Sequence, residues 1–246
     1  MSWKRGKLWA YSITYDEGCA ALLEHALPLH RKYGIPGHVA LVASQVGVPR
    51  NVPGSSYDGM MILSREEVRM LCAEGWGVSC HGMTHAAIGA ENALYEVARA
   101  RSTLEDALGL PITLFCVPGN NDSYPAALAV ARQAGYRGIL TIYDDVNRPG
   151  TDPFRLCRVP LHTEYPPPFH SAFDPHKRLH QAMDCGGWVV DYCHCPMPGR
   201  PIHPWKDCTL EQLEERFATV VRLGAGDVWL AEPNDVVDFM AGNEVP

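Results

Sequence analysis

Two histidines four residues apart, His81 and His85, are the strongest chemical signal in the sequence. They follow the apolar segment Gly77–Cys80, which predicts a strand, and one helical turn or a compact loop brings both imidazoles to the same side. Paired imidazoles are ligands that zinc and related divalent metals prefer. The alternative is two ordinary loop histidines in a chain that has eleven. Their spacing and position after a strand favour a metal site.

Two adjacent acids, Asp16 and Glu17, form the second signal. They lie in the motif Thr14–Gly18, at the end of an apolar segment that predicts the first strand. Adjacent acids are also common at helix starts, where they interact favourably with the helix dipole, so the pair alone indicates little. In a parallel barrel, however, active-site side chains gather at the carboxyl ends of strands. The position of these acids therefore favours a functional role.

A third segment, Trp188–His194, is an apolar strand candidate that ends in a histidine. Imidazole titrates near neutrality, so His194 could give a proton to a leaving group, although an isolated strand-end histidine is more often structural. The flanking Cys193 and Cys195 raise the alternative of a soft-metal site. Strand alternation opposes it, because the two thiols would point to one face and the imidazole to the other.

The elements that must position these residues alternate between short apolar runs and amphipathic stretches, which is typical of a parallel sheet with crossover helices. We expect an α/β fold: a distorted (β/α) barrel of about seven parallel strands, forming one domain over residues 1–246. An open doubly wound sheet is the alternative. The expected strands are Leu8–Tyr15, His38–Ala43, Gly77–Cys80, Thr113–Val117, Gly138–Thr141, Phe154–Val159, Trp188–His194 and Val228–Leu230. The expected helices include Cys19–Tyr33, Pro125–Gly135, Pro175–Cys185, Leu210–Leu223, Asn234–Met240 and one that opens with a capping box at Ser64 and Glu67.

Composition excludes several classes of protein. The 246 residues carry a net charge of −7, which argues against nucleic acid as a partner. No apolar run approaches the roughly 20 residues that span a bilayer, and no export signal follows the first residues, so we expect no membrane partner and a cytoplasmic location. The nine cysteines are odd in number and scattered, which indicates reduced and mostly buried side chains. The oligomeric state stays open.

Taken in order, these motifs resemble those of the polysaccharide deacetylase family, the NodB-homology domain. Its first motif, Thr-Phe-Asp-Asp-Gly, is similar to Thr14–Gly18, and its second, His-(Ser/Thr)-x-x-His, is similar to His81–His85. The segment Phe115–Gly119 resembles the family's Phe-Arg-x-Pro-(Tyr)-Gly, and the strand ending at His194 resembles its hydrophobic-x-His motif. The correspondences run from about Trp9 to Asp238. The fold that the resemblance implies, a distorted (β/α) barrel, agrees with the alternation of elements.

The resemblance also implies roles for single residues. His81 and His85 would bind a divalent metal together with Glu17; zinc is favoured, with cobalt, nickel or iron as alternatives. Asp16 would be the general base, His194 would protonate the departing amine, and a backbone N–H near Gly119 would help to hold the oxyanion. The implied activity is metal-dependent hydrolysis of a non-peptide C–N bond, most simply in a polysaccharide or amino-sugar N-deacetylase. A saccharide or small molecule would be the substrate.

The chain departs from the family pattern at three places. The family has Asp where this chain has Glu17, and the arginine that orients the catalytic Asp is Cys116 here. From its place in the chain, Arg158 could substitute for that arginine. Asp144 and Asp145 lie where the family has an Asp/Trp motif, but without the Trp. These departures support an alternative: a catalytically silent metal- or carbohydrate-binding module with the same fold.

Two further features concern the mouth of the site. The proline-rich segment His162–Ser171 is either a loop at that mouth or a plain surface connection. Trp205 is a candidate to line a substrate cleft, whereas Trp76, Trp188 and Trp229 lie in or beside apolar strands and are expected in the core.

Overall fold

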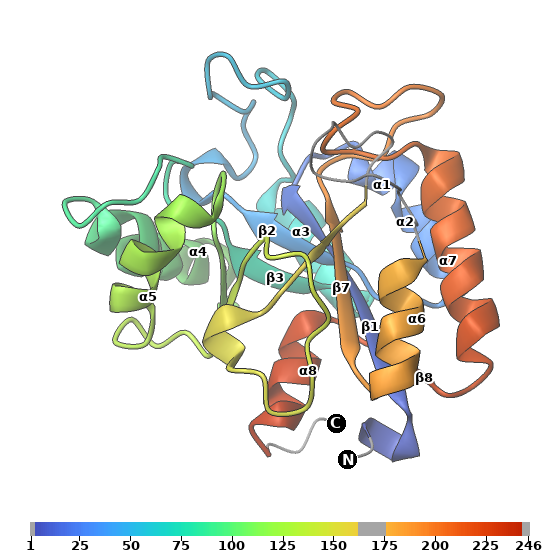
Figure 1. Cartoon of the computed structure of the whole chain (residues 1–246). Helices are drawn as coiled ribbons and strands as arrows, with labels where there is room; N and C mark the ends of the chain where they lie inside the picture. The colour runs from blue at the N-terminus through green and yellow to red at the C-terminus, as the bar shows by residue number, and fades with distance from the viewer. Residues whose placement is uncertain (1–2, 162–175, 243–246) are drawn as a thin grey trace.

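The computed structural model describes residues 3–161 and 176–242, which form a curled parallel sheet surrounded by helices (Figure 1). The strand order is β5-β4-β3-β2-β1-β7-β6, with β8 paired to β1, and every strand pair is parallel. A single bridge between Leu140 and Leu156 links β5 to the segment that leads into β6. The predicted distorted barrel is therefore confirmed. The strands are β1 (Trp9–Glu17), β2 (His38–Leu41), β3 (Gly77–Cys80), β4 (Leu114–Cys116), β5 (Gly138–Leu140), β6 (Val159–Pro160), β7 (Trp188–Cys193) and β8 (Val228–Leu230).

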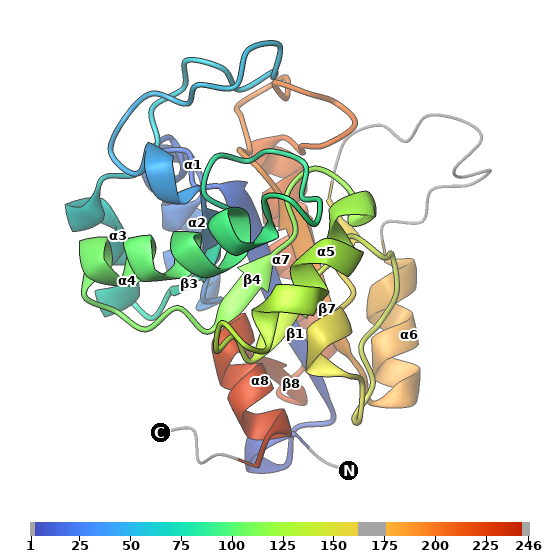
Figure 2. The same cartoon turned by 90° about the vertical axis from the view of Figure 1, so that its left-hand side faces the viewer.

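Helices cover the outside of the sheet, as two perpendicular views show (Figures 1 and 2). They are α1 (Leu22–His25), α2 (Leu27–Tyr33), α3 (Arg65–Ala73), the π-helical turn η3 (Leu94–Arg99), α4 (Ala100–Leu108), α5 (Tyr124–Ala131), α6 (Lys177–Cys185), α7 (Leu210–Gly224) and α8 (Pro233–Met240). The predicted capping box at α3 is present: Ser64 Oγ accepts from the N–H of Glu67, whose carboxylate accepts from the N–H of Ser64. Helix α8 lies at the end of the barrel opposite the long loops.

Strand β1 is the axis of the fold, and all nine of its residues are buried. It pairs with β7 from Ala10 to Tyr15, with β8 at its amino end and with β2 at its carboxyl end. Strand alternation divides its side chains: Trp9, Tyr11, Ile13 and Tyr15 pack in the larger core between sheet and helices, and Ala10 belongs to the smaller core inside the barrel. Asp16 shares the parity of Ala10. Asp16, the candidate general base, therefore lies on the barrel side of β1.

Two element predictions are wrong in detail. The expected strand Phe154–Val159 is instead a 3₁₀ turn, Pro153–Arg155, followed by the two-residue β6. The turn begins there because Asp152 accepts a hydrogen bond from the N–H of Phe154, and proline suits the first position of a helical turn. The expected helix Cys19–Tyr33 starts only at Leu22 and is divided into α1 and α2.

The ends of the described chain lie together, away from the long loops. Trp3 is buried and packs against Trp229 and Phe239, with ring centroids 6.3 and 6.1 Å apart. At the opposite end, the β2–α3 loop and the β7–α7 loop rise above the sheet in both views. The segment His162–Ser171, expected at the mouth of the site, lies outside the described residues. None of the described helices combines the length and apolarity needed to cross a membrane.

Candidate active site

A cavity of about 400 Å³ opens at the carboxyl ends of β1, β3 and β7, between the two long loops. Six of the seven candidate residues lie in its wall: Asp16, Glu17, His81, His85, Gly119 and His194. The seventh, Arg158, lies behind Asp16. The other lining residues are Arg50, Val52, Pro53, Gly54, Ser55, Tyr57, Ile142, Tyr192, Trp205 and Lys206.

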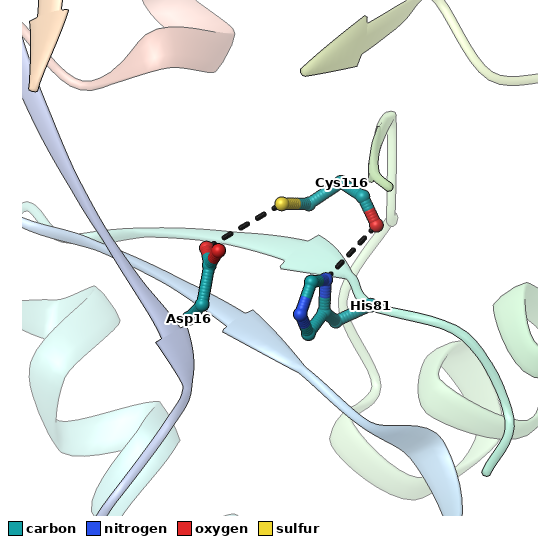
Figure 3. Close-up of side chains that lie close together, drawn as sticks. All are labelled: Asp16, His81 and Cys116. Atoms are coloured by element: carbon teal, nitrogen blue, oxygen red, sulfur yellow. Dashed lines mark hydrogen bonds between the residues drawn. The ribbon is translucent and has the colours of Figure 1, made fainter. Parts of the chain in front are cut away.

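The side chains of Glu17, His81 and His85 are close enough to bind one metal ion, because one ligand atom from each lies within 4.8 Å of the other two. The His81 Nδ1 donates to the carbonyl of Cys116 at 3.0 Å (Figure 3), which leaves its Nε2 as the lone-pair nitrogen. Burial lowers the pKa of His81 to about 3 and that of His85 to about 4. Both imidazoles are therefore neutral at physiological pH, as metal ligands must be.

Two of these three residues have unusual backbone conformations. Glu17 has a φ of 73° and His85 a φ of 69°, in the left-handed region that residues other than glycine rarely adopt. Gly18 continues the turn with a φ of 72°, and a Cβ there would lie 2.4 Å from a methyl carbon of Leu41. The turn brings the Glu17 Oε1 to 3.0 Å from the His85 Nε2. Backbone strain of this kind persists where the surroundings hold it, often at functional sites.

Asp16 is 4% exposed and paired with a buried arginine. Arg158 Nη1 donates to Asp16 Oδ1 at 2.6 Å, and its Nη2 donates to Oδ2 at 3.1 Å. Burial alone would raise the pKa of Asp16, but the charge of Arg158 and the nearby His81 hold it well below its usual value. The Cys116 thiol, whose pKa burial raises, keeps its proton and donates to Oδ1 at 3.4 Å (Figure 3). Asp16 is therefore a buried carboxylate that is ionised at neutral pH.

His194 approaches the cavity from just beyond β7 and is held by two residues that the sequence analysis missed. Tyr57 stacks on its ring at a centroid distance of 4.8 Å, and the Tyr57 hydroxyl donates to Asp207 Oδ2 at 2.7 Å. Asp207 Oδ1 accepts from the N–H of His194 and lies 3.5 Å from its Nδ1. Asp207 is fully buried; burial would raise its pKa, yet the contacts with His194 and Tyr57 lower it. A buried carboxylate thus orients this imidazole.

Arg50 is the third residue missed from the sequence. Its side chain is 2% exposed and forms an ion pair with Glu17 Oε2 on the side away from His85. The lining of the cavity thus includes a buried cation next to a candidate metal ligand. No local motif surrounds Arg50, Tyr57 or Asp207, so only the folded chain reveals them.

The comparisons with known proteins agree with this geometry. The family model described as "Polysaccharide deacetylase" matches residues 7–139, more than half of the chain. The chain belongs to the polysaccharide deacetylase family. Among solved structures, IcaB from Ammonifex degensii is 25% identical with a TM-score of 0.50, over 60% of this chain and 66% of that one. A putative polysaccharide deacetylase from Mycobacterium smegmatis is 16% identical with a TM-score of 0.59, over 98% and 93%. No curated protein matches the sequence.

The structure places the remaining candidates of this family member as follows. Asp144 and Asp145 form ion pairs with Arg178 and do not line the cavity. Trp205 is 55% exposed and lies at the cavity, whereas Trp76 and Trp188 are buried and Trp229 is partly buried. In the described part of the chain, Cys193 and Cys195 join no group of three potential metal ligands, and all nine cysteines are free thiols.

Proposed function

We propose that this chain is a metal-dependent N-deacetylase that hydrolyses the amide C–N bond of an acetamido group on a saccharide or amino sugar. One observation carries the proposal: an ionised Asp16 lies in the same cavity wall as the Glu17–His81–His85 group, with His194 in that cavity too. Membership in the polysaccharide deacetylase family supports the reaction class. The solved relatives under 25% identity support the fold alone.

The donor set fits a divalent transition metal. Two neutral imidazoles and one carboxylate are a ligand set that zinc accepts with positions left open, and cobalt, nickel or iron would fit a similar site. Such an ion, when bound, polarises the amide carbonyl and lowers the pKa of water to about 7. Glu17, His81 and His85 would hold it.

The chain's own residues would move the protons. Asp16 accepts the proton of the attacking water at a carboxylate oxygen, and the Arg158 fork keeps that carboxylate ionised and aimed. His194 gives a proton from Nε2 to the departing amine, because its Nδ1 faces Asp207 and the Lys206 carbonyl. Asp207 is then the counter-ion of the charged imidazolium. A backbone N–H near Gly119 would help to hold the oxyanion.

The test combines metal analysis with turnover. We expect about one transition-metal ion per native chain, and loss of that ion when His81→Ala and His85→Ala are combined. With acetylated chito-oligosaccharides or acetamido sugars as substrates, Asp16→Asn should lower kcat by about 10²–10⁴-fold while the metal content stays unchanged. Equal rates of acetate release by Asp16→Asn and native protein would refute Asp16 as the base.

A catalytically silent binding module is the second candidate, because Cys116 replaces the family's arginine and Arg50 contacts Glu17. It predicts saccharide binding that Asp16→Asn leaves nearly unchanged and no release of acetate from any acetamido sugar by metal-loaded protein. The two functions therefore separate on a single acetate assay.

A further inference from the structure

Arg50 is fixed in place by the backbone around it. Its N–H donates to the carbonyl of Met60 at 2.7 Å, and its own carbonyl accepts from the N–H of Gly59 at 2.8 Å. An antiparallel bridge between Pro49 and Met61 closes the base of the same β2–α3 loop. These hydrogen bonds fix the backbone of Arg50, and its side chain forms part of the cavity wall.

The guanidinium of Arg50 is buried without enough hydrogen-bond acceptors. The residue is 3% exposed, and its Nε makes no hydrogen bond within the described structure. Its Nη1 contacts Glu17 Oε2, which is the one ion pair that the described residues give it. Burial lowers the pKa of Arg50 to about 10, so the side chain is still a cation at neutral pH. A buried cation with an unused donor is costly unless a ligand supplies an acceptor.

The charge balance of the cavity shows which ligand would suit it. The charges of Asp58 and Asp16 are felt at Arg50, but both oxygens of Asp16 already accept hydrogen bonds from Arg158. If Glu17 is a metal ligand, its single negative charge is shared between a divalent cation and Arg50. A loaded site therefore has excess positive charge, which an anionic substrate group would balance.

We infer that Arg50 is a carboxylate-recognition residue, and that the amide substrate of this enzyme carries a carboxylate. A carboxylate is favoured because its two coplanar oxygens match the planar donor fork of one buried guanidinium. The cavity of about 400 Å³ accommodates a substrate moiety of monosaccharide size beside it. This inference rests on the proposed function for the identity of the amide, whereas carboxylate binding by Arg50 can be measured without turnover.

The experiment uses two matched pairs of probes on zinc-loaded protein. N-acetylglucosaminuronic acid is compared with N-acetylglucosamine, and N-acetylglycine with N-acetylglycinamide, by calorimetric Kd and by acetate release. For at least one pair, the acid should bind native protein about tenfold or more tightly than its neutral partner. Arg50→Met should abolish this preference, and Arg50→Lys should restore part of it, because lysine keeps the charge but not the fork.

Lys206→Met is the matched control, since it removes an exposed cation from the same wall and should change the preference little. Zinc content and circular dichroism report whether each variant folds. If Arg50→Met does not fold, the test rests on the preference for acid over neutral probes in the native and Arg50→Lys proteins. Equal affinity for acid and neutral probes, no measurable binding of either acid, or a preference that survives Arg50→Met overturns the inference. The inference is also overturned if N-acetylglucosamine 6-phosphate binds more tightly than N-acetylglucosaminuronic acid.

The outcomes separate the inference from the proposed function. Acetate released equally well from acid and neutral probes would support the deacetylase and overturn the role of Arg50. An acid preference that depends on Arg50, without acetate release, would support carboxylate recognition and count against the deacetylase.

Discussion

At the scale of single residues, Arg158 supplies the cation beside Asp16. The family pattern supplies this cation from a different position in the chain. The family pattern has an arginine where this chain has Cys116, and Cys116 only donates a thiol hydrogen bond to the carboxylate. Arg158 reaches the same carboxylate with two donors, and its Nε is fixed by the Thr141 carbonyl at 2.9 Å. The electrostatic requirement of a buried carboxylate is thus met from the segment just before β6.

Replacing Arg158 should change the pH dependence of the reaction. In Arg158→Met, burial would act on Asp16 without an opposing charge, so the pKa of Asp16 should rise and its ionised form should be lost at higher pH than in the native protein. We expect the acid limb of the kcat/KM profile to move to higher pH. Arg158→Lys should move it less. An unchanged acid limb in Arg158→Met would show that Arg158 does not control Asp16.

The residues that sequence could identify are those whose neighbours in space are also neighbours in the chain. Asp16 and Glu17 are adjacent, and His81 and His85 are four apart, so short motifs predict them. Arg50 and Asp207 lie in separate long loops, and nothing in their local spacing indicates that they reach Glu17 and His194. Their roles depend on how the two loops fold over the sheet.

At the scale of elements, a buried aromatic cluster joins β1, α2 and α7. His30 of α2 lies 4.4 Å from the Trp76 ring and 4.8 Å from the Phe217 ring, between centroids. Its Nδ1 contacts the Ile35 carbonyl at 2.7 Å, and its Nε2 contacts the Tyr15 hydroxyl at 2.8 Å. Because the carbonyl can only accept, Nδ1 carries the proton and the Tyr15 hydroxyl donates to Nε2. This arrangement requires a neutral imidazole.

His30 should therefore make the fold sensitive to acid. Burial lowers its pKa to about 3, below the ordinary value of 6.5, so the unfolded chain takes up a proton that the folded protein rejects. The free energy of unfolding should fall by up to about 1.4 kcal/mol per pH unit between about pH 6.5 and 3 from this group. Denaturant titrations at pH 7 and 5 test this. His30→Gln should be less stable at pH 7 but lose less between the two pH values; equal losses would contradict the assignment.

Strands were predictable where no turn-forming or capping residue interrupts the apolar run. The exceptions have local causes. The buried runs that form β1, β3 and β7 follow from hydrophobicity alone. The segment from Phe154 to Val159 also carries apolar residues, interrupted by two arginines. Asp152 and Pro153 favour a turn at its start, and β6 has only two residues. The hydrogen bond from the N–H of Phe154 to Asp152 stabilises the turn there, and the segment forms a turn instead of a strand.

At the scale of the whole molecule, the Glu17–His81–His85 group joins β1 to the segment after β3. A metal ion bound there would tie together parts of the barrel that are distant in the chain. A ligand that binds only the folded state stabilises it, by about 2.7 kcal/mol when its concentration is 100 times Kd. For a protein of this size we expect zinc at that excess to raise Tm by about 5–11 °C.

The His81→Ala/His85→Ala double variant is the control for this measurement and should show no rise in Tm with zinc. A rise of the same size in both proteins would place the stabilising ion elsewhere. Chelation of the native protein should return its Tm to the metal-free value.

The packing of Trp3 against Trp229 and Phe239 has a practical consequence for engineering. It brings the first and last described segments together at the α8 end, opposite the β2–α3 and β7–α7 loops (Figures 1 and 2). Trp3 and Phe239 are therefore neighbours in space although they lie at opposite ends of the described sequence. A solid support or a second protein attached at this end would leave the loops around Asp16 unobstructed.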